Sequence, residues 1–237
     1  MSLPVAILAG GLGTRMLPHT LTVPKAMIET CGEPFAAHQL RLLARNGCRN
    51  VVFLVGYLGE AIEAFAGDGS RFGLNVAYVY DGDRSLGTAG AVVQALPLLG
   101  EAFLLTFGDA YLRADHADVE RAFLAAETDG LMTIFRPGER GETPNVEYRD
   151  GLIVAYDKKA RSKKMEYIDY GLSAFRARAF ANVTPGSSAD LSDINQALIA
   201  RKQLAAYVVE DRPFEIGSPE GLAETERFLK GSRTSNE

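Results

Sequence analysis

Short apolar runs typical of β-strands alternate with segments of helical periodicity along the first half of the chain. The strand-like runs are residues 4–8, 51–55, 74–80 and 102–109, and the helical patterns are residues 34–47, 59–67 and 88–99. The run at 102–109 is apolar along its length, as expected for a central parallel strand that helices cover on both faces. The alternation predicts an α/β fold with a doubly wound, mostly parallel sheet.

After about residue 138 the pattern changes. Residues 145–160 alternate around a turn at 149–151 and predict a β-hairpin. A strand is expected at 165–175, a helix at 192–203 with Ser192 as N-cap, and a strand at 204–210. A closing helix is expected with Ser218 as N-cap, Pro219 at its first position and Gly231 as its stop. We expect one continuous domain, residues 1–237, with a smaller β/α half inserted after the first half.

Composition excludes several classes of protein. The 237 residues carry a net charge of −5 without basic blocks, which argues against nucleic acid as the main partner. Two cysteines without a CxxC pair favour neither a disulfide framework nor a zinc site. The first apolar run is too short for a signal peptide, and no segment is long enough to span a membrane. We therefore expect a soluble, cytoplasmic protein with no membrane partner.

A glycine-rich loop, "AGGLGTR", follows the first strand-like run. It matches neither a Walker loop nor a dinucleotide loop, because Met16 stands where the latter would need a third glycine. Glycines expose backbone N–H groups to a polyanion, Arg15 can bind phosphate oxygens in a fork, and Lys25 supplies a point charge. In doubly wound sheets ligands bind beyond the carboxyl ends of the strands, where Gly108–Asp109 also lies.

These segments together resemble a known family. "LAGGLGTRMLPHTLTVPKAMIE", "LGTAGA", "LLTFGDAY" and "FEIGSPEGL" are similar, in this order, to the signature of the sugar-1-phosphate nucleotidyltransferases. The resemblance covers nearly the whole chain. It implies a Rossmann-like core and an enzyme that joins an NTP to a sugar 1-phosphate, releasing pyrophosphate and forming an NDP-sugar. It also implies Mg²⁺ as cofactor, a nucleotide-binding half at 1–137 and a sugar-phosphate-binding half at 138–237.

The resemblance implies a role for individual residues. Arg15 would bind the leaving pyrophosphate, Lys25 the α-phosphate and the attacking phosphate, and Asp109 the metal, with Glu215 as second metal ligand. The nucleotide-binding residues would be Ala9, Gly10, Gly11, Gly13 and Thr14, with Asp81, Gly87 and Thr88 at the base. The sugar-binding residues would be Asn145, Lys159, Asp169, Tyr170 and Gly171.

Two positions depart from the family pattern. Glu215 stands where relatives usually carry aspartate or asparagine, and Lys158 precedes Lys159 where many carry glutamate. A lost acceptor at a sugar hydroxyl discriminates strongly between sugars. The sugar, the base and a homo-oligomeric state therefore stay open. Two alternative functions also stay open, a nucleotidyltransferase for a non-sugar phosphate such as phosphocholine and a non-catalytic nucleotide-sugar-binding regulatory protein.

Overall fold

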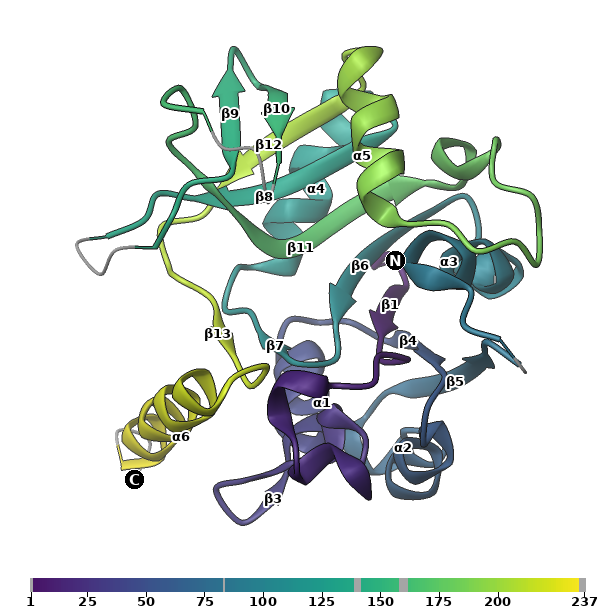
Figure 1. Ribbon diagram of the computed structural model, residues 1–237, viewed down its shortest axis with the longest axis vertical. Helices are drawn as coiled ribbons and strands as arrows, with labels where there is room; N and C mark the ends of the chain where they lie inside the picture. The colour runs from purple at the N-terminus through teal and green to yellow at the C-terminus, as the bar shows by residue number, and fades with distance from the viewer. Residues whose placement is uncertain (1, 83, 139–141, 158–161, 235–237) are drawn as a thin grey trace.

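The computed structural model describes residues 2–82, 84–138, 142–157 and 162–234, and Figure 1 shows the arrangement of its elements. The strands are β1 (Val5–Leu8), β2 (Glu29–Thr30), β3 (Glu33–Pro34), β4 (Asn50–Val55), β5 (Asn75–Tyr80), β6 (Ala102–Phe107), β7 (Ala110–Tyr111), β8 (Gly130–Phe135), β9 (Val146–Arg149), β10 (Leu152–Tyr156), β11 (Ile168–Arg176), β12 (Leu204–Val208) and β13 (Phe214–Glu215). The α-helices are α1 (Phe35–Arg45), α2 (Gly59–Ala66), α3 (Gly87–Leu99), α4 (His116–Ala126), α5 (Leu191–Ala200) and α6 (Pro219–Thr234).

One mixed sheet runs through the described part of the chain, in the order β5-β4-β1-β6-β11-β8-β12-β10-β9. Strands β5, β4, β1 and β6 are parallel to one another, and β8 is parallel to β12. Strands β11 and β10 run antiparallel to their neighbours, so the remaining strands of the sheet all point in one direction. The sheet confirms the predicted α/β fold with mostly parallel strands.

Helices cover both faces of the sheet. Side chains alternate along β1, so Val5 and Ile7 pack in one apolar cluster and Ala6 packs in another on the opposite face. Helices α1, α2 and α4 contribute to the first cluster, and α3 and α5 contribute to the second. The sheet is therefore doubly wound, as predicted. None of the helices in the described residues is long and apolar enough to cross a membrane.

The strand order reverses between β1 and β6. From β1 the chain builds outward through β4 to β5, then returns through α3 to place β6 on the other side of β1. Leu8 at the end of β1 lies beside both Leu54 and Phe107 in the register of the sheet. The loops after β1 and β6 consequently diverge at one edge, and such a reversal leaves a crevice in open α/β sheets.

Sequence reasoning differed from the structure in the middle and at two helix ends. It assigned no element to α4 or β8, although β8 is buried along its length. The N-cap of α5 is Asp190, whose carboxylate accepts from the Ser192 N–H, so the prediction of Ser192 was wrong. Helix α6 continues past Gly231, because a glycine lowers helix propensity but ends a helix only where the backbone turns. The predicted hairpin is confirmed, with Asp150 and Gly151 both at positive φ between β9 and β10.

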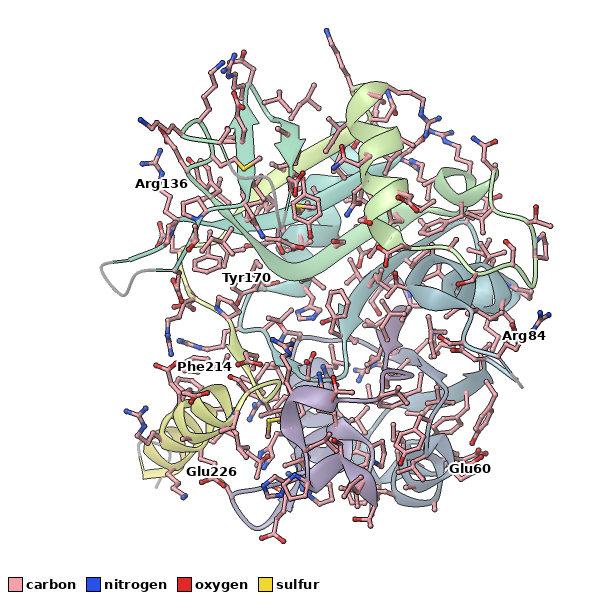
Figure 2. The ribbon with its side chains drawn as sticks, viewed as in Figure 1. Glu60, Arg84, Arg136, Tyr170, Phe214 and Glu226 are labelled. Atoms are coloured by element: carbon pink, nitrogen blue, oxygen red, sulfur yellow. The ribbon has the colours of Figure 1, made fainter. Side chains whose placement is uncertain are left out.

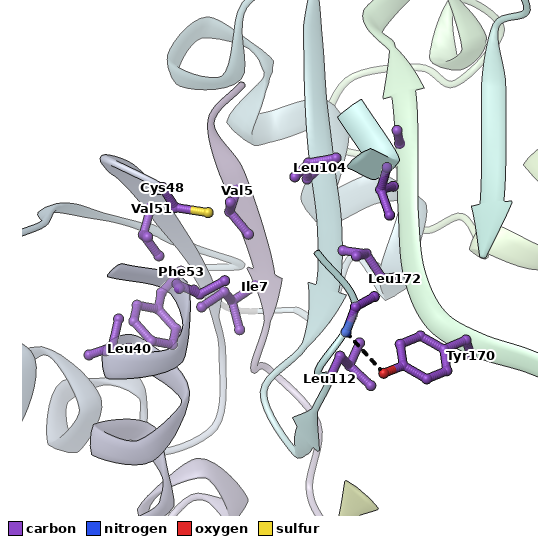
Figure 3. Packing of buried hydrophobic residues seen from close by; sticks show 14 of the residues in the cluster. Val5, Ile7, Leu40, Cys48, Val51, Phe53, Leu104, Leu112, Tyr170 and Leu172 are labelled. Carbon is purple, nitrogen blue, oxygen red and sulfur yellow. Dashed lines mark hydrogen bonds between the residues drawn. The ribbon is translucent and has the colours of Figure 1, made fainter. Parts of the chain in front are cut away.

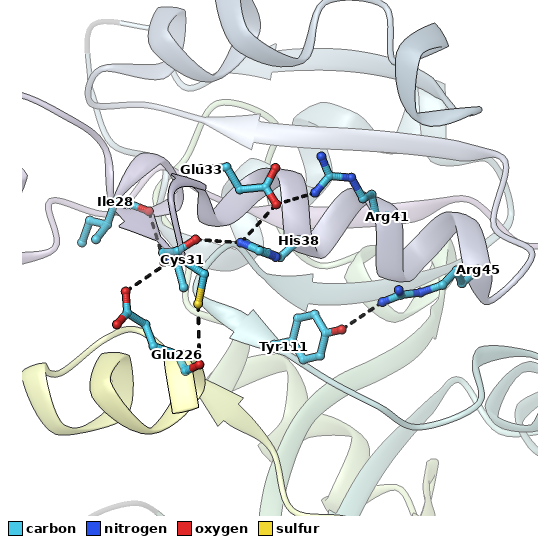
Figure 4. A network of polar contacts seen from close by, with 9 residues as sticks. Ile28, Cys31, Glu33, His38, Arg41, Arg45, Tyr111 and Glu226 are labelled. Carbon is cyan, nitrogen blue, oxygen red and sulfur yellow. Dashed lines mark hydrogen bonds and ion pairs between the residues drawn. The ribbon is translucent and has the colours of Figure 1, made fainter. Parts of the chain in front are cut away.

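Helix α6 packs against β13 of the small β7–β13 pair (Figure 1). A third apolar cluster joins it to the start of the chain, with Phe35, Phe214 and Leu229 among its members. Polar contacts reinforce this junction: Cys31 donates from its N–H to the Glu226 carboxylate and from Sγ to the Glu226 carbonyl (Figure 4). The Cys31 N–H bond lowers the pKa of Glu226. The C-terminal helix is thus tied to the β2–β3 hairpin.

Tyr170 on β11 lies in the middle of the molecule, among the buried side chains that Figures 2 and 3 show. Only 2% of it is exposed, and its hydroxyl accepts from the N–H groups of Arg113 (2.9 Å) and Ala114 (3.2 Å). These bonds hold the segment that follows β7 against β11. The Tyr170 side chain therefore belongs to the core.

We predict that Tyr170→Phe lowers the free energy of unfolding by about 1–3 kcal/mol, because the buried N–H of Ala114 and the partly buried N–H of Arg113 lose their acceptor. Urea denaturation followed by circular dichroism measures this difference. Tyr148→Phe serves as control, since the Tyr148 ring packs edge-on against Tyr167 on the β9 side of the sheet. Equal stability of Tyr170→Phe and the unsubstituted protein would show that the hydroxyl contributes nothing.

Candidate active site

A cavity of about 220 Å³ opens at the strand edge where the sheet order reverses. Its walls come from the ends of β1, β4 and β6, from the loop after β1 and from the start of α3. Eight residues singled out from the sequence line it: Ala9, Gly10, Gly11, Lys25, Asp81, Gly87, Thr88 and Asp109. Residues far apart in the sequence are thus brought together at one site.

Lys25 and Asp109 form an ion pair at this cavity. The Lys25 ammonium lies 2.8 Å from Asp109 Oδ2, and the two side chains are 21% and 23% exposed. Pro24 precedes a short 3₁₀ turn, Lys25–Met27, that presents the lysine, while Asp109 follows β6. An ammonium has three donors, so Lys25 keeps two for an anion in the cavity.

The Glu215 carboxylate also lies near Asp109. Strand β13 pairs with β7 so that Glu215 faces Ala110, and the Ile216 N–H bonds to the Asp109 carbonyl at 2.9 Å. A Cβ at Gly217 would lie 2.6 Å from Glu215 Oε2 and 2.9 Å from Asp109 Oδ2, so both carboxylates border this glycine. A larger residue at position 217 would displace one of them.

Glu215 is also bound to the start of α6. Its carboxylate accepts from the Gly217 N–H and from Ser218 Oγ, and Ser218 Oγ in turn accepts from the Gly221 N–H at 3.0 Å. Ser218 is therefore the N-cap of α6, as predicted. The anchoring of α6 at Glu226 consequently also holds Glu215 near Asp109.

Arg15 and Gly13 do not line the cavity. Arg15 is exposed, and its Nη2 would lie 3.3 Å from a Cβ at Gly217, so it borders the Asp109–Glu215 pair from outside. Gly13 has φ of +63° and lies against Thr20, whose hydroxyl donates to the Gly13 carbonyl at 2.9 Å. Gly13 shapes the loop that presents Thr14 and Arg15.

Asp81 follows β5 and lines the cavity beside the glycine loop. Burial raises the pKa of its carboxyl. The Leu86 N–H, which donates to Asp81 Oδ2 at 3.4 Å, lowers this pKa by a smaller amount. Gly10 and Gly56 let Asp81 approach, because a Cβ at Gly56 would lie 3.3 Å from Asp81 Oδ2 and 3.1 Å from the Gly10 carbonyl. Gly56 was not predicted from the sequence, although a glycine directly after the strand-like run at residues 51–55 could have indicated it.

Gly87 and Thr88 join the cavity to the second half of the chain. Gly87 has φ of +68°, and a Cβ there would lie 2.5 Å from the Ala189 carbonyl. Thr88 Oγ1 accepts from the Leu191 N–H at 2.7 Å. The loop that lines the cavity therefore packs directly on the start of α5.

The expected sugar-binding residues gather at the start of β11. Asp169 accepts from the Tyr156 hydroxyl (2.8 Å) and the Gly171 N–H (3.0 Å), and Asn145 Oδ1 accepts from the Asp169 N–H. Since β11 runs antiparallel to β6, this cluster lies at the sheet edge where β6 ends. It does not line the cavity, and the buried Tyr170 hydroxyl is occupied by the backbone, so Tyr170 could contact a ligand only through its main chain. Lys159 and Lys158 lie outside the described residues.

The donor set suits a hard divalent cation. Within the described ranges no group of three or more His, Cys, Asp or Glu side chains could hold a metal. Mg²⁺, however, is usually held by one or two carboxylates, with phosphate and water as its other ligands. Asp109 lines the cavity, and Glu215, which is not among the lining residues, lies close to Asp109 beside Gly217. They fit a Mg²⁺ that a bound phosphate completes.

Comparisons with known proteins agree with this geometry. The family model "Nucleotidyl transferase" matches residues 5–232. Mannose-1-phosphate guanylyltransferase of Mycobacterium tuberculosis is 30% identical over 95% of this chain and 62% of its own length. N-acetylmuramate alpha-1-phosphate uridylyltransferase of Neisseria meningitidis is 43% identical over 44% of this chain and 45% of its own length. Glucose-1-phosphate thymidylyltransferase of Streptomyces griseus is 29% identical over 94% of this chain and 65% of its own length.

Solved structures share the fold. HddC from Yersinia pseudotuberculosis, crystallised with GMP-PN, superposes with a TM-score of 0.79 at 19% identity, over 96% of this chain and 99% of that one. A Bacillus anthracis protein assigned as a glucose-1-phosphate thymidylyltransferase gives a TM-score of 0.84 at 18% identity, over 96% and 95% of the two chains. In sequence, the matches span less than two thirds of the length of the three curated relatives named above. The match of the family model over nearly the whole chain shows that this protein belongs to the nucleotidyl transferase family.

Proposed function

We propose that this protein transfers a nucleoside monophosphate from an NTP to a sugar 1-phosphate, forming an NDP-sugar and releasing pyrophosphate. The observation that carries the proposal is the Lys25–Asp109 ion pair at a cavity that the glycine loop also lines. A cation with free donors, bare backbone N–H groups and a carboxylate for a metal are the groups that phosphoryl chemistry requires.

The chain's groups would act by position and charge. The backbone of Ala9, Gly10, Gly11 and Gly13, with Thr14, would hold the triphosphate, and Arg15 would bind the departing pyrophosphate at the cavity mouth. Lys25 would donate to the α-phosphate and to the attacking sugar phosphate, where negative charge builds up in the transition state. Asp109 and Glu215 would hold Mg²⁺, which when bound offsets the repulsion between the two phosphates.

The two halves would bind different substrates. Residues 1–137 would bind mainly the nucleotide, with Asp81, Gly87 and Thr88 at the base. Residues 138–237 would bind mainly the sugar phosphate, through Asn145, Asp169, Gly171 and Lys159. The base and the sugar are best found by assay, since the relatives named above use G, U or T nucleotides with mannose, N-acetylmuramate or glucose phosphates.

A pyrophosphate-release assay tests the proposal. The purified protein is incubated with Mg²⁺, each of the four common NTPs and a panel of mannose, glucose and N-acetylmuramate 1-phosphates, with phosphocholine included. We expect release with one NTP and at least one sugar 1-phosphate. Release with phosphocholine alone would support the non-sugar alternative, and tight nucleotide binding without any turnover would support a regulatory protein.

Substitution of Lys25 tests its role in the transition state. Lys25→Ala should lower kcat by about 10²–10³-fold, because the lost charge acts mainly on the transition state. Steady-state kinetics with circular dichroism of the folded protein measures this effect. Lys164→Ala removes an exposed lysine and should keep the original rate. A rate close to the original for Lys25→Ala would remove Lys25 from the reaction.

Substitution of Asp109 tests its role as a metal ligand. Asp109→Asn keeps the shape of the side chain but removes its charge, so the Mg²⁺ concentration for half-maximal rate should rise about tenfold or more. Asp118→Asn, on the exposed side of α4 beside Arg121, is the matched control. An unchanged Mg²⁺ titration would exclude Asp109 as a ligand.

A further inference from the structure

Gln39 on α1 bridges the turn between β6 and β7 that carries Asp109, and we call this turn the corner. Its Nε2 donates to the Phe107 carbonyl at 2.8 Å and to the Ala110 carbonyl at 2.9 Å. These carbonyls lie directly before and after Gly108–Asp109, the two residues between β6 and β7. Both hydrogens of one amide nitrogen are thus used to bridge the corner.

The other sides of this corner are also fixed. The Gly108 N–H bonds to the Leu8 carbonyl, and the Asp109 carbonyl accepts from the Ile216 N–H, each at 2.9 Å. A Cβ at Gly108 would lie 3.1 Å from Ala9 Cβ, so the corner packs closely on the end of β1. Backbone groups of Leu8 on β1 and of Ile216, the residue after β13, therefore hold two sides, and the side chain of Gln39 holds the third.

Packing alone does not account for an amide at this position. Gln39 is 2% exposed and lies among the buried residues Ala36, Leu40 and Leu43 of α1. Its Oε1 is buried without a hydrogen-bond partner among the described residues, which costs free energy that an apolar side chain would avoid. The reverse orientation of the amide would place Oε1 against two carbonyl oxygens, so the donating orientation is fixed by its surroundings.

We propose that Gln39 is a positioning residue that sets the Asp109 carboxylate for its contacts with Lys25 and a divalent cation. The inference rests on the proposed function, in which Asp109 is a metal ligand. Asp109 Oδ2 already lies 2.8 Å from the Lys25 ammonium, and a shift of the corner would change this distance directly. Displacement of a reacting group by about 1 Å can cost a hundredfold in rate.

The test uses Gln39→Met, which fills similar space without a donor. We expect kcat to fall by about a hundredfold and the Mg²⁺ concentration for half-maximal rate to rise several-fold. The KM for the nucleotide should change by less than about twofold, because the glycine loop stays intact. Hydrogen–deuterium exchange should quicken in a peptide that covers the corner, while peptides of β4 and β5 keep their protection.

Two further variants keep the result interpretable. Leu40→Met alters packing on the same helix without touching the corner and should keep the original rate, Mg²⁺ response and exchange. Gln39→Asn keeps the amide but is one methylene shorter, so it cannot reach both carbonyls. It should behave like Gln39→Met, and it replaces that variant if Gln39→Met does not fold.

The outcomes separate the two proposals. Suppose that the unsubstituted protein releases pyrophosphate, and that Gln39→Met and Gln39→Asn leave kcat and the Mg²⁺ response unchanged. This result would overturn the role of Gln39 and leave the proposed function standing. A fall in rate of equal size in Leu40→Met would also overturn it. If the unsubstituted protein releases no pyrophosphate from any substrate pair, the proposed function fails. In that case the role of Gln39 is tested by hydrogen–deuterium exchange of the peptide that covers the corner. Exchange that is unchanged in both Gln39 variants would overturn the positioning role.

Discussion

The reversal of strand order between β1 and β6 is the constraint on which the site depends. Because β4 and β5 extend the sheet to one side of β1 and β6 lies on the other, the loops after β1 and β6 turn away from each other. The cavity lies at this opening, and the ion pair of Lys25 with Asp109 at its lining joins the segment after β1 to the segment after β6. Charge placement in this protein is thus a consequence of sheet topology.

The closing segment of the chain completes the same site from outside the main sheet. Pairing of β13 with β7 brings Glu215 beside the Asp109 corner, and the Ser218 cap fixes the direction in which α6 leaves. Helix α6 is in turn anchored to the β2–β3 hairpin through Cys31 and Glu226 (Figure 4). Glu215 is more than one hundred residues from Asp109 in the sequence. Its position near Asp109 therefore depends on the β7–β13 pair, on the Ser218 cap and on the contact of Cys31 with Glu226.

The sequence predicted the parts of the protein that depend on local pattern. Continuous apolar runs identified β4, β5 and β6, and the Asp150–Gly151 pair identified the hairpin, because each depends on residues close in sequence. Long-range features were inaccessible from one sequence. The start of α5 at Asp190 is accompanied by a bond from the Leu191 N–H to Thr88, about one hundred residues away in the chain. Gly56 matters because it lies against Gly10, at the end of the neighbouring strand β1. The family resemblance implied that Tyr170 contacts the sugar, but its hydroxyl accepts hydrogen bonds from the backbone N–H groups of Arg113 and Ala114.

Gln39 illustrates what a pattern can and cannot indicate. It stands within the buried stretch of α1, where an apolar residue would be expected, and this departure was visible in the sequence. The role of Gln39 was not visible in the sequence, because the two carbonyls that it bridges are 68 and 71 residues away. A buried amide that leaves its own oxygen unsatisfied is retained at a cost in stability. Under the proposed function, the geometry of the Asp109 carboxylate would decide how two phosphates and a metal ion meet, and this role would account for the cost. A helix that only covered a sheet would gain nothing from such an amide.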